Sequence, residues 1–437
     1  MSSDWPLKPL EDIATEVTVG FVGSMASEYV DDGVPFLRSL NVDPFGINTS
    51  DLKFVSTEFH QRIKKSALRP GDVVIVRTGK PGTCAVIPEW LNDANCSDLV
   101  IARCGAEIRP RFLCYWINSA AAHHISSHLV GAVQQHFNVG AAKKMLVATP
   151  SLFAQDQVIS ILGSIDDRIT LLRETNATLE AIAQALFKSW FVDFDPVRAK
   201  AEGRQPEGMD ATTAALFPDS FEESELGLVP KGWKVKPVGD AVDCLGGGTP
   251  DTKEPSYWEP AEHCWTTPKD LSGLQSPVLL RTERQLSSLG LAKVSSGLLT
   301  AGTLLLSSRA PIGYLAIAQM PVAVNQGYIA IPPGGELSPV YMLFWCRQNM
   351  EGIKGRANGS TFMEISKKAF RPIPALVPTA DVLDAFANIA EPLFERLIEN
   401  ERQAQTLTQL RDTLLPRLIS GQLRLPEAEQ CVEEALA

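Results

Sequence analysis

The sequence predicts an α+β protein in which one arrangement, a globular domain followed by a long helix, is used twice. An apolar heptad stripe runs through 158–190, a second stripe lies 228 residues later at 386–418, and matching motifs precede both stripes. The expected division is a first domain at 1–150, a helix at 151–193, a connector at 194–232, a second domain at 233–380, a second helix at 381–425 and an acidic tail at 426–437.

The first stripe follows alternating steps of four and three residues, and neither proline nor glycine occurs in 164–190. Its one polar member is Asn176, for which two interpretations stay open: a buried asparagine that fixes the helix register, or a side chain at the solvent margin. The second stripe is less regular and contains Pro392, which should kink the helix or mark its start. Two helices with narrow apolar stripes are expected to pair with each other or with partner helices.

The repeat extends through the domains. Lys8-Pro9 matches Lys236-Pro237, and the segment 68–90 matches 299–320 as a glycine turn, an apolar strand, a polar loop with an arginine and a second strand. Short strands with many glycine and proline turns indicate small irregular sheets with a few helices. The connector, rich in acidic residues, Pro, Gly and Ala, is predicted to lie on the surface with at most a short helical turn.

Composition is typical of a folded protein: 437 residues are 45% hydrophobic and 21% charged. No uncharged apolar run is long enough to span a bilayer, the first residues do not resemble a signal peptide, and the eight cysteines form no CxxC pair. A cytoplasmic protein with free thiols and no membrane contact is therefore expected.

The net charge of −11 is unevenly distributed, because the segments 1–150 and 233–380 carry net charges of only −1 and +3. Such domains would bind DNA weakly alone, so basic partners are expected to share the task.

Motifs of enzymes are missing from the sequence. There is no GxGxxG after a strand, no GxxxxGK[ST] loop, no HExxH or GxSxG, and no methyltransferase tetrapeptide of the Asn/Asp-Pro-Pro-Tyr type. His124 and His128 have helical spacing but lack further ligands at metal-site spacing, so surface or core histidines are expected instead of a metal site. The chain is predicted to be neither an enzyme nor a holder of a cofactor.

Several segments resemble the specificity subunit of type I restriction–modification systems, and the resemblance covers nearly the whole chain. They are LFKSWFVDFDPVRAK at 186–200, SELGLVPKGWKV at 224–235, GGTPDTKEPSYW at 247–258, TTPKDL at 266–271 and LRDTLLPRLISGQLRL at 410–425. The resemblance implies two target recognition domains, each reading one half of a split DNA site, and two helices that pair as an antiparallel coiled coil. It also implies partners: two modification subunits that bind S-adenosylmethionine and methylate adenine, and restriction subunits that use ATP and Mg²⁺ to translocate and cut DNA.

The repeat independently favours a protein that reads two separate half-sites. Two similar but non-identical domains, separated by stiff helices, would read two different half-sites with an unread spacer between them. An identical pair of half-sites would require identical domains.

Base edges are read by side chains that donate or accept hydrogen bonds, and phosphates by lysine and arginine. The polar loops offer candidate DNA contacts in the first domain, namely Arg38, Asn41, Arg77, Thr78, Lys80, Gln134, Gln135, His136, Asn138, Lys143 and Lys144. The candidates of the second domain are Thr249, Lys253, Lys269, Ser308, Arg309, Asn358, Ser360, Thr361, Lys367 and Lys368. The alternative for the loop at 77–80 is an ordinary solvated hairpin, and for the lysine pairs a solvated surface.

Two rival hypotheses come from other classes. A stand-alone DNA methyltransferase or nuclease with an unrecognised site would modify or cut DNA with labelled S-adenosylmethionine or Mg²⁺ alone. A repeat protein that only binds other proteins would show no salt-dependent, sequence-dependent DNA retention.

Overall fold

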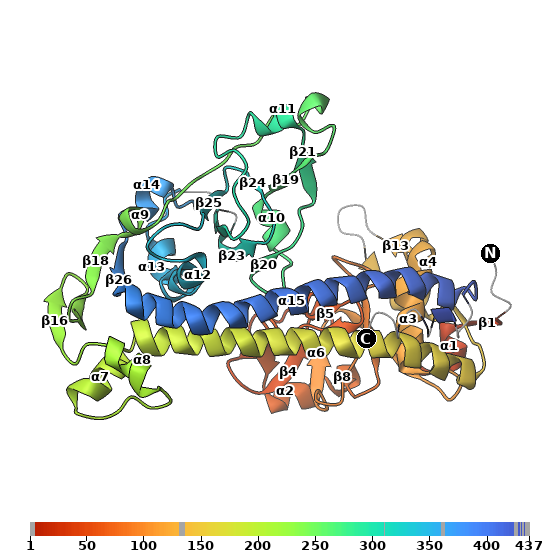
Figure 1. The fold of residues 1–437 in the computed structure, drawn as a ribbon. Coiled ribbons are helices and arrows are strands. Elements are labelled where there is room, and N and C mark those ends of the chain that lie inside the picture. Colours follow the sequence, from red (N-terminus) through yellow and green to blue (C-terminus); the bar gives the residue numbers. More distant parts are fainter. Residues whose placement is uncertain are drawn as a thin grey trace. The chain divides into compact units, whose positions relative to one another are not determined.

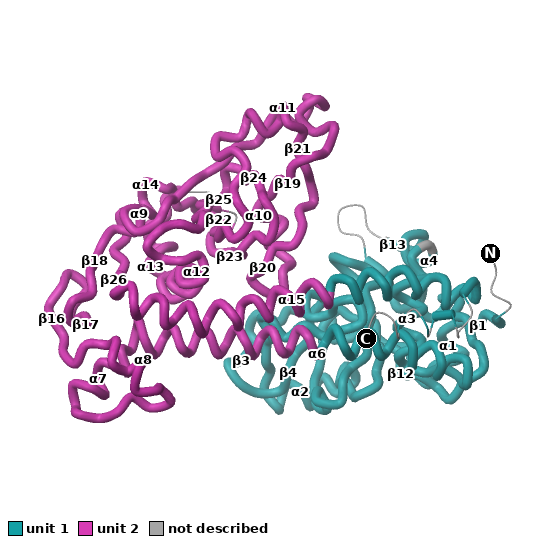
Figure 2. The backbone as a smooth tube through the Cα atoms, viewed as in Figure 1, with its two compact units in different colours: residues 1–170, 405–437 teal, residues 171–404 magenta. Residues whose placement is uncertain are grey.

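The structure is a computed structural model that describes residues 5–130, 136–309, 311–359 and 363–423, with 427, 428, 430 and 432. The chain forms two compact units (Figure 2), unit 1 from 1–170 and 405–437 and unit 2 from 171–404. Each unit contains a globular domain and one half of each of two long helices, α6 (Leu152–Phe191) and α15 (Ala380–Ile419), which Figure 1 shows side by side. The predicted α+β fold with two domains and two long helices is confirmed.

The predicted seam is the contact surface of the two helices. Of its ten positions on α6, all are buried except Leu179 and Leu186, which are half-buried. In unit 2, Asn176 of α6 bonds Asn400 of α15, whereas the rings of Phe187 and Phe386 meet farther along, with centroids 6.0 Å apart. Residue numbers rise along one helix as they fall along the other, so the helices are antiparallel.

Asn176 lies inside the seam, which decides between the two interpretations of this residue. Its side chain is 3% exposed, and that of Asn400 is 1% exposed. The Asn400 Nδ2 donates to Asn176 Oδ1 over 2.9 Å, and Asn176 Nδ2 donates to the Leu397 carbonyl oxygen over 3.3 Å. An amide pair in an apolar seam favours the one register in which both amides meet.

The helix α15 runs through Pro392 and begins twelve residues earlier, at Ala380. The expectation that this proline marks the helix start is therefore wrong. Pro392 is exposed, so the carbonyl group that loses its N–H partner to proline can be hydrated instead.

In unit 1 two small sheets pack with short helices. The first has the order β10-β9-β12-β2, with β2 (Ala14–Val19), β9 (Val73–Val76), β10 (Cys84–Val86) and β12 (Leu99–Cys104). The second has the order β3-β7-β4-β11-β8, with β3 (Tyr29–Val30), β4 (Val34–Leu37), β7 (Lys53–Val55), β8 (Ala67–Leu68) and β11 (Ala94–Cys96). The pairing of β11 with β4 is parallel.

The remaining elements of unit 1 close the domain. Short ribbons are β1 (Leu7–Pro9) with β15 (Leu146–Ala148), β5 (Val42–Asp43) with β6 (Gly46–Ile47), and β13 (Leu129–Val130) with β14 (His136–Phe137). The helices are α1 (Leu10–Ile13), η1 (Ser39–Asn41), α2 (Thr57–Arg62), η2 (Lys64–Ser66), α3 (Pro110–Ala120), α4 (Ala122–Ser127) and α5 (Val139–Lys143).

Unit 2 repeats this plan. One sheet has the order β20-β23-β22-β25, with β20 (Val278–Leu279), β22 (Leu304–Ser308), β23 (Ile312–Ala318) and β25 (Tyr328–Ile331). The other has the order β21-β19-β24, with β19 (His263–Thr266), β21 (Arg284–Leu286) and β24 (Ala323–Val324), and the β19–β24 pairing is again parallel. The ribbon is β18 (Lys234–Pro237) with β26 (Pro374–Val377). The helices are α9 (Val238–Ala241), η3 (Pro255–Tyr257), α10 (Pro268–Leu271), α11 (Ser288–Leu291), α12 (Pro339–Gln348), α13 (Met350–Gly355) and α14 (Lys367–Phe370).

The internal repeat extends to the strand register. Lys8 pairs with Val147 in unit 1, and Lys236 pairs with Ala375 in unit 2, so both partners are displaced by the same 228 residues. Lys8 forms an ion pair with Glu107, just before α3, and Lys236 forms one with Glu336, just before α12. The two domains are therefore copies of one backbone design.

The connector between the halves is more ordered than predicted. It forms α7 (Asp195–Ala201), α8 (Ala211–Leu216) and a hairpin of β16 (Phe221–Ser224) with β17 (Gly227–Pro230). Its few large apolar side chains, Val197, Phe217 and Val229, join the core of unit 2, where the Phe217 ring lies edge-on to Trp190. Most residues of the connector are exposed, as expected, but the expectation of at most a short helical turn was wrong, because a large aromatic cluster is available to cover its few apolar side chains.

Replacing Asn176 tests the seam. Asn176→Leu leaves the buried Asn400 amide without its acceptor, so the free energy of unfolding should fall by about 1–3 kcal/mol. The double variant Asn176→Leu/Asn400→Leu should recover most of that loss, because an apolar pair of similar size needs no hydrogen bond. Urea denaturation followed by circular dichroism measures both values.

The control for this experiment is Arg173→Leu, which changes an exposed residue of α6. It should alter the unfolding midpoint little. A double variant that is as unstable as Asn176→Leu would show that the amide pair is not the cause.

Candidate nucleic-acid interface

Most of the predicted contact residues of unit 1 gather where strands β4, β9 and β11 end. Backbone hydrogen bonds connect these loops in pairs: the amide of Ser97, after β11, donates to the carbonyl oxygen of Leu37 at the end of β4 over 3.0 Å, and the amide of Phe137 donates to that of Arg77, after β9, over 2.9 Å. We call the loops at 38–51, 77–80, 97–98 and 136–138 the first polar edge.

At the centre of the first polar edge is a carboxylate that the sequence analysis did not single out. Asp98 Oδ1 accepts from Arg77 Nη1 over 2.6 Å, and its Oδ2 accepts from the Thr78 hydroxyl over 2.9 Å. Arg77 also donates through Nε to the Phe137 carbonyl oxygen over 3.0 Å. The Arg77 side chain is 13% exposed and that of Asp98 is 42% exposed, so the arginine fixes the loops while the carboxylate faces solvent.

The loop after β4 contains one correction. Asn41 is fully buried and donates to the carbonyl oxygens of Asn48 and Ser50 over 3.0 and 3.2 Å. It braces its own loop and is not accessible to a ligand, because the chain turns inward at this fourth residue after β4. Arg38 forms an ion pair with Asp51 at 2.9 Å. Hydrogen bonds from Lys53 and Arg38 lower the pKa of Asp51, which is exposed.

The other candidates of unit 1 surround this loop cluster. Lys80 is exposed in the hairpin turn, and His136 is half-buried beside Thr78, to which its backbone pairs. Asn138 caps α5, since its Oδ1 accepts from the Ala141 amide over 2.8 Å. At the other end of α5, Lys143 is half-buried and Lys144 exposed.

Unit 2 has a second polar edge at the equivalent strand ends, formed by the described residues of the loops at 246–253, 267–270, 308–309, 325–327, 358–359 and 363–368. The amide of Asn325 donates to the Thr266 carbonyl oxygen over 3.1 Å, and the amide of Ile365 donates to that of Ser308 over 3.0 Å. The first of these bonds matches Ser97 with Leu37, and the second matches Phe137 with Arg77. The same backbone connections therefore hold both edges together.

Side chains differ between the edges although the backbone bonds agree. On the second edge the exposed Thr249 donates its hydroxyl to Gln326 Oε1 over 2.6 Å. Arg309 lies near Glu364, with Nη1 and Oε2 3.7 Å apart, and the backbone of Glu364 pairs with that of the exposed Asn358. No counterpart of the Arg77–Asp98 bond is found among the described residues of this edge.

Ser308 is the second correction. It is 2% exposed and its backbone closes the hairpin against Gly327 and Ile365, so its hydroxyl is not accessible. The register shift between Leu306 and Ser308 turns this side chain inward, which the sequence pattern does not reveal.

The lysines of unit 2 that were predicted to contact DNA are all exposed. The Nζ of Lys269 lies 2.8 Å from Glu283 Oε2, and this carboxylate raises the pKa of the lysine. Lys253 lies in the loop after Thr249, and the helix α14 begins with Lys367 and Lys368. A Cβ at Gly246 would lie 2.9 Å from Lys367 Nζ, so this amine borders the loop that carries Thr249.

Four predicted residues lie outside the described residues, namely Gln134, Gln135, Ser360 and Thr361. Two others that now belong to the edges, Asp98 and Gln326, were not predicted. The repeat could have revealed them, because each follows a short apolar strand by two residues and the two positions differ by 228.

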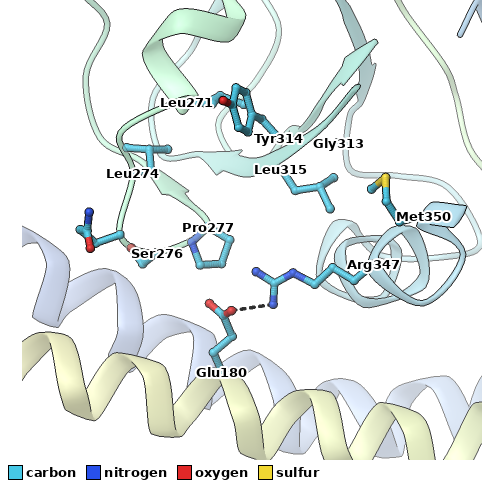
Figure 3. A pocket seen from close by; sticks show the side chains of 11 residues that line it. Glu180, Leu271, Leu274, Ser276, Pro277, Gly313, Tyr314, Leu315, Arg347 and Met350 are labelled. Atoms are coloured by element: carbon cyan, nitrogen blue, oxygen red, sulfur yellow. Dashed lines mark ion pairs between the residues drawn. The ribbon is translucent and has the colours of Figure 1, made fainter. Parts of the chain in front are cut away.

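A cleft of about 330 Å³ in unit 2 lies where the domain meets the long helices (Figure 3). In it, Arg347 of α12 forms an ion pair with Glu180 of α6 at 2.7 Å. The matching attachment in unit 1 is a hydrogen bond from the Tyr115 hydroxyl to Asp166 over 2.6 Å. These contacts fasten each domain to the helices and provide no pair of free acid and base groups.

The residues that the structure describes include no group of three or more His, Cys, Asp or Glu side chains able to hold a metal ion. Burial raises the pKa of the Cys244 thiol to about 11, which keeps it protonated and unreactive at neutral pH. None of the helices in the described ranges has the length and apolar character needed to cross a membrane.

Comparison with known proteins gives consistent results. Residues 230–408 match the family described as the type I restriction modification DNA specificity domain. The chain is 28% identical to the type I restriction enzyme HindI specificity subunit of Haemophilus influenzae, over 63% of this chain and 68% of that protein. It is 36% identical to the MjaIX specificity subunit of Methanocaldococcus jannaschii, over 42% of each.

The fold also resembles a solved structure. The crystal structure of the S subunit of a type I restriction–modification system from M. genitalium superposes with a TM-score of 0.53 at 14% identity, covering 95% of this chain and 96% of that one. This likeness shows a shared fold over both domains and both long helices. The chain is similar to the specificity subunits of type I restriction–modification systems, and its residues 230–408 match their DNA specificity domain.

Proposed function

We propose that this chain reads an asymmetric, bipartite DNA site, one half-site with each polar edge, and performs no chemistry itself. The observation that carries the proposal is the duplication: equivalent loops, joined by equivalent backbone hydrogen bonds, present different side chains in the two units. Rigid loops with hydrogen-bonding side chains suit the reading of base edges in the major groove. Different side chains favour different half-sites.

Charge supports a shared binding task. The domain segments 1–150 and 233–380 are nearly neutral, and several of their basic side chains, such as Arg38 and Lys269, are already paired with carboxylates. Affinity for DNA comes largely from phosphate contacts, so the chain alone should bind weakly. Two modification subunits would supply the missing contacts, and restriction subunits would complete the assembly in the cytoplasm.

Catalysis is assigned to those partners. Methylation would use S-adenosylmethionine on the modification subunits, and translocation with cleavage would use ATP and Mg²⁺ on the restriction subunits. The polar edges fit this division, because their acidic side chains are tied to neighbouring residues: Asp98 to Arg77 and Thr78, and Glu364 to Arg309.

The long helices would set the spacer between the half-sites. Both α6 and α15 run without interruption from one unit into the other, and their seam is buried along its length. A continuous helix pair resists stretching, so the number of unread base pairs would follow from helix length.

Exchanging one domain tests the modular claim. A chimaera with residues 1–150 of another family member, assembled with the modification subunits, should methylate DNA at a site with one new half and one unchanged half. Sequencing of methylated adenines measures this. A chimaera whose methylated site changes in both halves would contradict one-domain, one-half-site recognition.

Lengthening both helices tests the spacer. Seven residues inserted after Thr178, with seven more at the facing turn of α15 near Ile398, add about 10.5 Å, which corresponds to about three base pairs. The methylated motif should keep both half-sites and gain about three spacer positions. The matched control exchanges the same turns for others of equal length, and an unchanged spacer in the lengthened chain would rule out the helices as the determinant.

A further inference from the structure

Asp98 and Gln326 occupy the same position in the two copies of the fold. Two sets of backbone pairs show it, on either side of the position. Before it, the Cys96 carbonyl oxygen accepts a backbone hydrogen bond from the amide of Phe21, and the Val324 carbonyl oxygen accepts one from the amide of Gly248. After it, Ala102 pairs with Val17, and Ala330 pairs with Leu245, again displaced by 228 residues.

In unit 1 the position is held rigidly. Asp98 has a φ of 51°, in the left-handed region that few residues other than glycine and asparagine adopt. Such a conformation persists only where the surroundings impose it, and here Arg77 and Thr78 bind both carboxylate oxygens. Each oxygen keeps a further lone pair, so the exposed carboxylate can still accept a hydrogen bond but cannot donate one.

In unit 2 the same position carries an amide. The Gln326 side chain is exposed, and the Thr249 hydroxyl binds its Oε1, which orients the group and leaves both Nε2 hydrogens and one lone pair available. The turn beneath it is also fixed, since Asn325 Oδ1 accepts from the Gly327 amide over 2.9 Å. The two copies therefore hold chemically different groups at one site, each oriented by a side-chain neighbour.

We propose that this shared position reads one base in each half-site, with Asp98 accepting from a cytosine amino group and Gln326 pairing with adenine. A carboxylate matches the N4 amino group of cytosine, and a glutamine amide matches the N6 and N7 edge of adenine. The proposal rests on the proposed function and deepens it by naming a specificity-determining residue in each domain. Arg77 and Thr249 act as positioning residues, because they bind the reading group and fix its direction.

Two isosteric variants test it in the assembled complex of this chain with its modification subunits. Asp98→Asn adds two donors, and Gln326→Glu removes two, with almost no change in size. Each is assayed for adenine methylation on a DNA library in which every position of both half-sites is randomised in turn. Asp98→Asn should alter base preference about tenfold to a hundredfold at one position of the first half-site only, and Gln326→Glu at one position of the second only.

The matched controls are Glu58→Gln and Gln348→Glu, which make the same changes at exposed residues of α2 and α12 outside the polar edges. Both should leave the motif unchanged. Thermal unfolding of every complex verifies that it is folded. If one of the two variants fails to fold, the variant in the other unit tests the proposal.

The outcomes separate this inference from the proposed function. If the wild-type complex methylates no bipartite motif, the proposed function fails. If the wild-type motif is bipartite but Asp98→Asn and Gln326→Glu give the same motif, change both halves, or lower methylation of all library members alike, the inference is overturned while the proposed function stands.

Discussion

The fold depends on the buried seam between the two long helices. Each domain is attached to the helices, through Tyr115 and Asp166 in unit 1, and in unit 2 both helices complete the core of the domain. In unit 2 this is visible directly: the rings of Phe187 and Phe191 of α6 and of Phe386 of α15 lie in one cluster with Tyr341 of the domain. The Asn176–Asn400 pair adds a geometric condition, because buried amides favour only the register in which they meet.

On this support the protein uses one domain plan twice, with different side chains at the two polar edges. The parallel strand pairs, the hairpins and the capped helices α5 and α14 recur, with Asn138 and Ser366 capping in equivalent places. The variable positions lie at strand ends, where a substitution changes the exposed chemistry without changing core packing. Under the proposed function, a protein built this way can change one half-site independently of the other.

The sequence predicted the parts that depend on periodicity. The heptad steps along 158–190 and the 228-residue repeat predicted the two long helices, the number of domains and the paired strands within 68–90 and 299–320. They did not predict the burial of Asn41 and Ser308, because an inward turn after a strand and a register shift depend on the neighbouring loops. The connector was missed for a related reason: Phe217 and Val229 find their partners on distant segments. Asp98 and Gln326 were overlooked because an isolated polar residue after a strand has no pattern of its own until the two copies are compared.

The central claim is that two unlike reading surfaces on one chain recognise two unlike half-sites across a gap of fixed length. The most direct measurement is the motif of methylated adenines produced by the wild-type complex on random DNA, determined by sequencing. The account predicts two different short half-sites with a constant number of unread positions between them. A single continuous site, or two identical half-sites in palindromic arrangement, would contradict it.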